Sequence, residues 1–174
     1  MAEGTPVGGM IAEYVDAGML APDELVDAVM KKQLKSFDLN DGFVIEGHPR
    51  NVEQAAAFDK IGKVNIAIQL KMPDAVAVKR LKGRLHCGTC GCMFHESQLP
   101  ASLAKCPVCT RKLIRRKDDD EETARRRIAA YHFMTEPMAG FYRQRGVLLA
   151  VNADQTIEQL FEELTRKLGK LGFA

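Results

Sequence analysis

Apolar and polar positions along this chain follow two periods, one typical of amphipathic helices and one typical of short buried strands. The helical period predicts helices over residues 8–17, 22–34, 54–60, 73–84, 119–145 and 156–171. Short apolar runs predict buried strands over residues 42–45, 64–70 and 147–151. Pro22, followed by two acids, favours a helix start, and Thr156 is a suitable N-cap for the last helix. Strands separated by helices predict a parallel α/β sheet covered on both faces.

A cysteine-rich segment interrupts this order of helices and strands. Two Cys-x-x-Cys pairs, separated by fifteen residues, supply four candidate metal ligands: Cys87, Cys90, Cys106 and Cys109. Thiolates at this spacing are typical of a tetrahedral zinc site, and four of them leave no open position, so the zinc would be structural. Iron is a less common occupant, and a disulfide pair or free thiols are the alternative.

Other residues of this segment are not needed as ligands. The fifth cysteine, Cys92, is expected to be a small apolar filler, and His86 and His95 lie beside a quartet that is already complete. The interruption predicts the domain organisation: a core made of residues 1–84 and 114–174, and an inserted zinc lid over residues 85–113.

Length and charge narrow the classes of function. A chain of 174 residues suits one domain, and a net charge of +2 does not suggest a general polyanion-binding role. No run of about eighteen apolar residues occurs, and the N-terminus lacks a basic-then-apolar signal pattern, so neither a membrane span nor secretion is indicated. Reduced, metal-bound cysteines predict an intracellular reducing compartment, either cytoplasm or mitochondrial matrix.

Basic residues around and after the cysteine pairs raise the hypothesis of a zinc ribbon that binds nucleic acid. Seven residues would carry this role: Arg111, Lys112, Arg115, Arg116, Arg125, Arg126 and Arg127. Proteins that bind single strands also stack bases on aromatic side chains, but only Phe94 lies nearby and the chain has no tryptophan. Nucleic-acid binding is therefore the weakest of the hypotheses.

The order of short motifs along nearly the whole chain resembles the adenylate kinase family, in its long-lid, zinc-carrying form. The motifs are Gly4-Thr5-Pro6-Val7-Gly8, residues 18–26, Glu46-Gly47-His48-Pro49-Arg50 with Gln54, Pro73-Asp74 with Arg80 and Arg84, Arg116-Lys117-Asp118-Asp119 with Glu122 and Arg127, and Tyr131, Thr135 and Pro137. Each motif alone is modest, whereas all of them in this order are hard to reach by chance. The resemblance implies a truncated nucleoside-monophosphate-kinase-like fold, a three-layer parallel α/β sheet with an inserted zinc lid held by four cysteines.

The resemblance also implies roles for individual residues. Arg50 would hold the AMP phosphate and Gln54 the adenine edge, with Thr5 also on the nucleotide-binding side. Four arginines would act in catalysis, on the ATP side and on the transferring phosphates: Arg80, Arg84, Arg116 and Arg127. Phosphoryl transfer depends on positioning and on neutralisation of charge, for which the planar and permanently charged guanidinium is well suited.

Three departures from the family pattern bear on function. The family begins with a strand, a Gly-x-x-x-x-Gly-Lys loop and a helix, but neither Gly62-Lys63 nor Gly169-Lys170 has a glycine five positions before its own. Glu46 stands where the family has an aspartate near the magnesium, and a misplacement of about 1 Å can lower a rate ~100-fold. His48 replaces a phenylalanine, and we expect it to be a partly exposed loop histidine.

The missing strand would be the central one of the sheet, between the strands expected at 42–45 and 64–70. Either these two strands pair directly, or another polypeptide fills the slot by strand addition. The leading hypothesis is a non-catalytic binding or structural subunit of a larger assembly with a protein partner. The alternative is a functional adenylate kinase that converts ATP and AMP to two ADP with Mg²⁺, its P-loop segment lying outside this sequence or coming from another chain. Whether AMP or ATP still binds stays open.

Overall fold

Helices predominate in the computed structural model, which describes residues 8–10, 14, 21–34, 42–100, 105–116 and 119–173. The chain divides into two units, which we describe separately. The first comprises Met1–Asn65 and Met134–Val147, and the second comprises Ile66–Phe133 and Leu148–Ala174. None of the described helices is both long and apolar enough to cross a membrane. The helix predicted over 8–17 is described only at residues 8–10 and 14, which are helical, and the rest of it lies outside the described residues.

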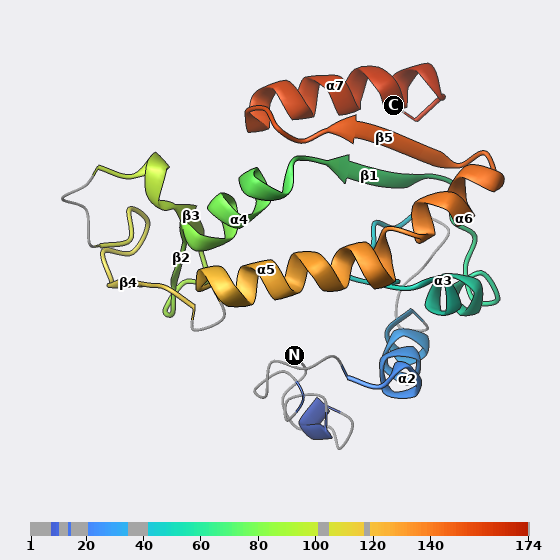
Figure 1. The fold of residues 1–174 in the computed structure, drawn as a ribbon, viewed down its shortest axis with the longest axis horizontal. Helices are drawn as coiled ribbons and strands as arrows, with labels where there is room; N and C mark the ends of the chain where they lie inside the picture. The colour runs from blue at the N-terminus through green and yellow to red at the C-terminus, as the bar shows by residue number, and fades with distance from the viewer. Residues whose placement is uncertain are drawn as a thin grey trace. The chain divides into compact units, whose positions relative to one another are not determined.

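Besides the helical residues 8–10 and 14, the described part of the first unit contains three helices (Figure 1): α2 over Asp23–Leu34, α3 over Val52–Phe58 and α6 over Met138–Gln144. The predicted helix over 22–34 is therefore confirmed, with Asp23 and Glu24 in its first turn. Asn51 caps α3, because its side chain accepts a 2.7 Å hydrogen bond from the Gln54 backbone N–H. Phe58, the last residue of α3, is 2% exposed and is the helix's main apolar anchor.

The strand predicted over 42–45 is wrong, because this segment has no regular secondary structure and belongs to none of the described sheets. An apolar run is buried as a strand only when a neighbouring strand pairs with it, and none of the strands described in this structure does so. Val44 is consequently 97% exposed. The Phe43 ring meets the edge of the Phe58 ring, with centroids 6.0 Å apart. Phe43 thus packs against the unit although the segment is not part of a sheet.

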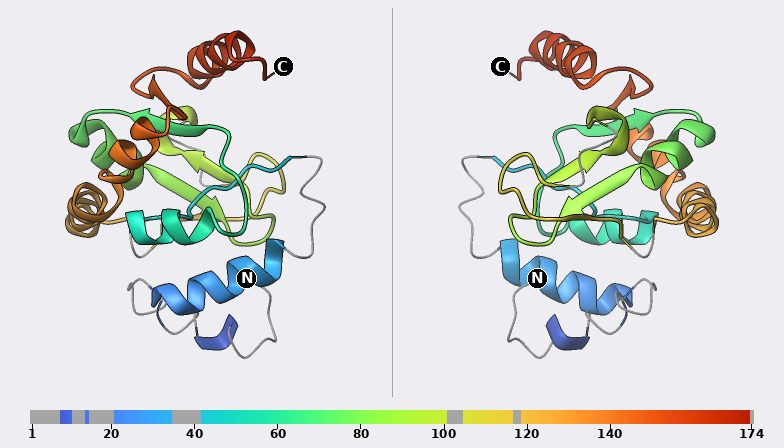
Figure 2. Two further views of the ribbon diagram at one scale, coloured as in Figure 1. Left: turned by 90° about the vertical axis from the view of Figure 1, so that its right-hand side faces the viewer. Right: turned by 90° about the vertical axis from the view of Figure 1, so that its left-hand side faces the viewer.

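A parallel pair of strands forms the sheet of the second unit (Figure 1, Figure 2). β1, over Ala67–Lys71, pairs in parallel with β5, over Leu148–Asn152. Helix α7, over Ile157–Lys170, packs on β5 and begins at Thr156, whose side chain accepts from the Gln159 N–H. The predictions of a parallel sheet and of the closing helix are confirmed, although the described sheet has two strands and not three.

The single long helix predicted over 119–145 is wrong. Asp120 caps α5, which covers Glu121–Ala130 and is followed by a π-helical turn over Tyr131–Thr135. Helix α6 then starts after Pro137. Proline has no backbone N–H and clashes with the preceding turn, so Pro137 ends one helical path and begins another. The apolar period alone could not locate this break.

The cysteine-rich segment forms a small antiparallel sheet of its own. Helix α4, over Asp74–Lys82, ends at Gly83, and β2 follows over Arg84–Cys87. β2 pairs with β3, over Met93–His95, and with β4, over Leu113–Ile114. The helix predicted over 73–84 thus extends two residues too far at its C-terminal end, and Arg84 begins a strand instead of ending a helix. A short 3₁₀ turn over Glu96–Gln98 follows β3 and is capped by His95.

Gly83 provides a test of the junction between α4 and β2. A Cβ atom at this buried position would overlap the imidazole of His95, which is held by hydrogen bonds to Ser97 (2.7 Å) and to the Lys79 carbonyl (3.4 Å). We expect Gly83→Ala to lower the free energy of unfolding by about 1–3 kcal/mol, measured by urea denaturation.

Gly140, in α6, is the matched control, because a Cβ there meets no atom within 4 Å. Gly140→Ala should raise the free energy of unfolding by up to about 1 kcal/mol through helix propensity. The loss at Gly83 should shrink when His95→Ala is added. An unchanged loss in that double variant would show that the His95 ring is not the cause.

Candidate functional site

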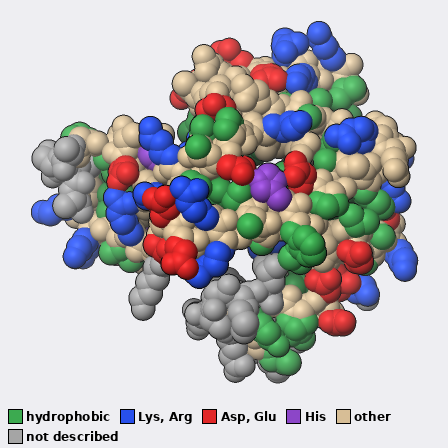
Figure 3. All heavy atoms as spheres, in the orientation of Figure 1, with side chains coloured by type: hydrophobic (Ala, Val, Ile, Leu, Met, Phe, Trp, Pro, Cys, Tyr) green, Lys and Arg blue, Asp and Glu red, His purple; other side chains and the backbone are tan. Residues whose placement is uncertain are grey.

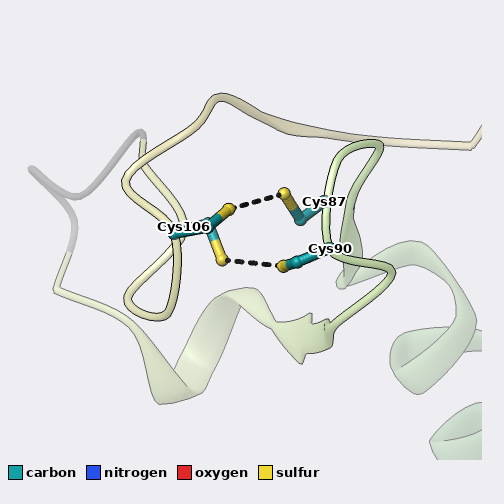
Figure 4. Close-up of side chains that lie close together, drawn as sticks. Cys87, Cys90 and Cys106 are labelled. Carbon is teal, nitrogen blue, oxygen red and sulfur yellow. Dashed lines mark hydrogen bonds between the residues drawn. The ribbon is translucent and has the colours of Figure 1, made fainter.

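The four cysteines of the two Cys-x-x-Cys pairs come together at the end of the small antiparallel sheet (Figure 4). The sulfurs of Cys87 and Cys109 lie 3.3 Å apart, and those of Cys90 and Cys106 lie 3.6 Å apart. All four ligand atoms lie within 4.8 Å of one another, and none is in a disulfide. Tetrahedral zinc with Zn–S bonds of about 2.3 Å places its sulfurs roughly 3.8 Å apart, which is within the range of separations in this cluster.

Two loops of the same shape present the sulfurs. In the first, the Cys87 N–H donates to the Cys92 carbonyl and the Gly91 N–H donates to the Cys87 carbonyl, both at 2.9 Å. In the second, the Cys106 N–H donates to the Arg111 carbonyl at 2.6 Å and the Thr110 N–H donates to the Cys106 carbonyl at 2.8 Å. The residue after each pair has a positive φ, 73° at Gly91 and 61° at Thr110. The backbone alone therefore imposes the turn that points both sulfurs of a pair inward.

The thiol environment favours ionisation of one cysteine. Backbone N–H groups of Cys90 and Thr89 hold the pKa of Cys87 down to about 6. The Arg111 N–H acts to lower the pKa of Cys109, but the neighbouring Cys87 sulfur and burial outweigh it and raise that pKa to about 12. Cys87 therefore ionises easily, whereas Cys109 does not, and all four thiols would ionise together only around a bound cation.

Neighbouring residues do not join the sulfur cluster. The His95 Nδ1 bonds Ser97, and the buried His86 Nδ1 has no partner in the described part of the chain. Cys92 contributes its carbonyl to the first loop, while its partly buried side chain stands outside the four-sulfur group.

Two of the arginines predicted to act in catalysis meet at one buried carboxylate. Asp119 is 5% exposed and accepts two hydrogen bonds from Arg84, from Nε at 2.9 Å and from Nη2 at 2.6 Å. The Arg127 guanidinium lies 3.7 Å from the same carboxylate. Asp119 precedes the N-cap of α5, while Arg84 starts β2, so this contact joins the helix to the cysteine-rich sheet. Arg84 and Arg127 thus lie together because both contact the Asp119 carboxylate.

Other basic side chains near α5 are also matched with acids. Lys82 contacts Glu121 at 2.6 Å, and Arg125 contacts it at 2.8 Å. Hydrogen bonds from these two cations, of which that from Lys82 has the larger effect, lower the pKa of Glu121 to about 2. Arg126 pairs with Glu122, and Arg115 pairs with Glu96. Figure 3 shows basic and acidic side chains intermingled over this part of the surface. The surface therefore alternates in charge and forms no uniform basic patch.

The other two predicted catalytic arginines have different contacts. Arg80, on α4, donates to the Gln155 carbonyl at 3.1 Å. Arg116 is exposed after β4, and its backbone carbonyl accepts a 3.2 Å hydrogen bond from the Asp119 N–H. The next two residues of its motif, 117 and 118, lie outside the described residues.

The residues predicted to bind AMP form a closed hydrogen-bond network in the first unit. Gln54, which is 7% exposed, donates to Asp23 at 2.6 Å and accepts from the Arg50 backbone N–H at 2.7 Å. Asn51 donates to the other oxygen of Asp23 at 3.0 Å. The Arg50 side chain donates to the Gly47 carbonyl at 2.8 Å. Sequence reasoning missed Asp23, because an acid in a first turn indicates only a helix start. Thr5 lies outside the described residues.

The expectation of a partly exposed His48 is wrong. His48 is 9% exposed, and its ring meets the edge of the Phe58 ring with centroids 6.2 Å apart. Burial lowers the pKa of His48 against the opposing charges of Asp27 and Asp23. The imidazole therefore packs as the aromatic ring of a phenylalanine would. Glu46, two residues before it, is exposed.

Asp119→Asn tests whether the buried carboxylate holds this region together. Removing the charge leaves Arg84 facing a neutral amide, so we expect the free energy of unfolding to fall by about 2–3 kcal/mol in urea denaturation. Glu122→Gln is the matched control, because Glu122 makes a 3.1 Å pair with Arg126 while its side chain is 81% exposed, and its loss should stay below about 0.5 kcal/mol. Equal losses in the two variants would contradict a special role for Asp119.

Comparisons with known proteins agree with the motif order. The model of the family described as "Adenylate kinase" matches residues 1–147. A protein named adenylate kinase from Clostridium botulinum (strain 657 / Type Ba4) is 34% identical over 174 residues, covering 97% of this chain and 81% of the relative. Adenylate kinases of Symbiobacterium thermophilum and Methanosarcina barkeri are 36% and 35% identical, over 94% and 97% of this chain and 79% and 80% of their own lengths. This chain therefore belongs to the adenylate kinase family.

Proposed function

We propose that this chain is a zinc-stabilised, adenylate-kinase-like protein that does not transfer phosphate by itself and serves as a binding or structural subunit of a larger assembly. The observation that carries the proposal is that the arginines predicted to bind phosphate already contact other groups of the protein. Arg84 and Arg127 share the buried Asp119, and Arg80 and Arg50 donate to backbone carbonyls. Each of these four guanidiniums is therefore oriented by an oxygen of the protein.

The 174 residues offer no phosphate cradle of the Gly-x-x-x-x-Gly-Lys type. Such a loop surrounds the nucleotide phosphates with backbone N–H groups at a helix N-terminus, and its lysine reaches the phosphates that move. Catalysis depends on groups that are already in place. Arginines that must first break contacts with other protein groups cannot replace this preorganised set of donors. This favours a chain that is inactive alone.

The AMP side supports the same proposal. Both functional atoms of the Gln54 amide, Oε1 and Nε2, are already used by Arg50 and Asp23. To read an adenine edge, the side chain would have to break two short hydrogen bonds in a nearly buried site. In this chain Gln54 therefore serves to tie α3 to α2.

A second candidate is a working adenylate kinase completed by another polypeptide, which would use Mg²⁺ with ATP and AMP. It is favoured by one observation, the presence of all four predicted catalytic arginines at family positions, Arg80, Arg84, Arg116 and Arg127. Binding of nucleic acid by the basic residues is not favoured, because Arg115, Arg125 and Arg126 are paired with acids.

The cysteine cluster would hold structural Zn²⁺ through Cys87, Cys90, Cys106 and Cys109. Four thiolates complete the coordination, so the ion would order the two loops and supply no chemistry. Thiolates survive in a reducing compartment, which supports the cytoplasm or a mitochondrial matrix as the location.

Metal analysis of the purified protein tests the cluster. We expect about one zinc per chain, a fall below half a zinc in Cys106→Ser, and a lower thermal midpoint after chelation. Cys92→Ser is the matched control and should keep its zinc. A wild-type protein with no bound zinc, or equal zinc loss in both variants, would contradict the assignment.

A coupled assay that follows ADP formation from ATP, AMP and Mg²⁺ tests the proposed function. We expect the 174-residue chain to show no turnover above background, far below the range of roughly 1–10³ s⁻¹ usual for enzymes. Turnover within that range by the zinc-loaded chain alone would overturn the non-catalytic proposal, and Arg127→Ala should then abolish it.

A further inference from the structure

His48 is a buried titratable side chain to which the proposed function gives no role. It is 9% exposed, and its ring meets the edge of the Phe58 ring, which is itself 2% exposed. The imidazole Nδ1 is buried and has no hydrogen-bond partner within the part of the chain that the structure describes. A neutral imidazole is tolerated in this place, because it packs as an aromatic ring and leaves one nitrogen unsatisfied. An imidazolium is not, since it carries a full charge and a second N–H donor.

The charges that face His48 come from helix α2 and from its own loop. Burial, the largest influence, lowers the pKa of His48 below the usual 6.5. Asp27 and Asp23, on α2, act to raise this pKa, and Arg50, in the same loop, acts to lower it. Helix α3 meets the imidazole with the apolar ring of Phe58. The two carboxylates thus offset only part of the cost of placing a charge against that ring.

The loop that carries His48 fastens several parts of the first unit through Arg50. The Arg50 N–H donates to Gln54 Oε1 at 2.7 Å, and the Arg50 carbonyl accepts from the Thr135 hydroxyl at 2.8 Å. Gln54 in turn donates to Asp23 of α2 at 2.6 Å. A displacement of His48 would therefore disturb the attachment of this loop to α2, to α3 and to the segment before α6.

We propose that His48 is an acid-sensitive contact, which keeps the loop of residues 46–50 closed while its imidazole is neutral and opens the loop when the imidazole is protonated. In the closed loop the ring packs on Phe58. In the open loop the imidazolium reaches water, and the hydrogen bonds from Arg50 to Gln54 and Thr135 are lost. The proposal rests on the burial of His48 by residues of this chain. It goes beyond the proposed function, because it holds whether or not the chain transfers phosphate.

The coupling between protonation and opening sets the size of the effect. An imidazole in water with a pKa of about 6.5 is about tenfold more protonated than neutral at pH 5.5, and about tenfold less at pH 7.5. The open loop takes up this proton more readily than the closed loop, so the open population grows by up to about tenfold over this range. The contribution of His48 to stability is therefore fully present above about pH 6.5, and it is lost as the pH falls toward the lowered pKa of the buried imidazole.

Amide hydrogen exchange of the zinc-loaded 174-residue chain, followed by NMR, tests the proposal. The protection factor of the Arg50 amide, which corrects for the intrinsic effect of pH on exchange, should fall about three- to tenfold between pH 7.5 and pH 5.5. The Ala153 amide, which donates to the Lys71 carbonyl in the second unit, is the internal control and should keep its protection. A change of less than about twofold at Arg50, or an equal fall at Ala153, would overturn the proposal.

Two variants separate the imidazole of His48 from other titrating groups. His48→Phe keeps an aromatic ring against Phe58 but cannot take up a proton, so the effect of pH on the Arg50 amide should disappear. His132→Asn is the matched control, because the His132 imidazole is a partly exposed partner of Asp74, and this variant should keep the effect. Persistence of the effect in His48→Phe, or its loss in His132→Asn, would contradict the assignment.

Titration of the wild-type imidazole by NMR is a second readout that needs no variant. The His48 Cε1–H resonance should titrate with a pKa below about 6.5, with the same midpoint as the shift of the Arg50 amide. Asp27→Asn removes an attraction for the imidazolium in the closed loop, so this midpoint should move to lower pH. A His48 that titrates at or above about 6.5, or a midpoint that rises in Asp27→Asn, would show that the closed loop accepts the charge and would refute the proposal.

Discussion

Convergence of four cysteine sulfurs is the constraint on which the second unit depends. The strands around it are short, four residues in β2, three in β3 and two in β4, and the fully buried side chains there are mainly Cys87 and Cys106 themselves. So little apolar burial cannot order this many loop residues against conformational entropy. Binding of a metal by the sulfurs would supply the missing free energy, because such a site exists only in the folded state.

Ion pairs fix the start of the cysteine-rich sheet to helix α5. Asp119 is buried between Arg84 and Arg127, and it joins the start of α5 to the first residue of β2. A buried carboxylate is tolerable only with such partners, so the two arginines are committed to structure before any ligand arrives. The same two arginines are those predicted to bind phosphate. Under that prediction, ligand binding and internal pairing would compete for one set of guanidiniums.

The sequence correctly predicted those features that depend on interactions between residues close together along the chain. The helix over 22–34, the strands at β1 and β5, the Thr156 cap and the meeting of the cysteines all follow from spacing within short windows. The expected strand over 42–45 failed because burial depends on a neighbour that the run itself cannot specify. The contacts Gln54–Asp23 and Arg84–Asp119 join residues 31 and 35 positions apart, and no pattern in one sequence marks them. His48 was misjudged because polarity was given more weight than ring shape.

The matching of basic and acidic side chains along α5 also affects how a ligand would arrive. Opposite charges a few ångströms apart cancel beyond about one Debye length, roughly 8–10 Å in physiological salt. Lys82, Arg125 and Glu121 form such a group. A diffusing nucleotide would feel little attraction until it nearly touches this surface, so its association rate constant should vary only weakly with ionic strength.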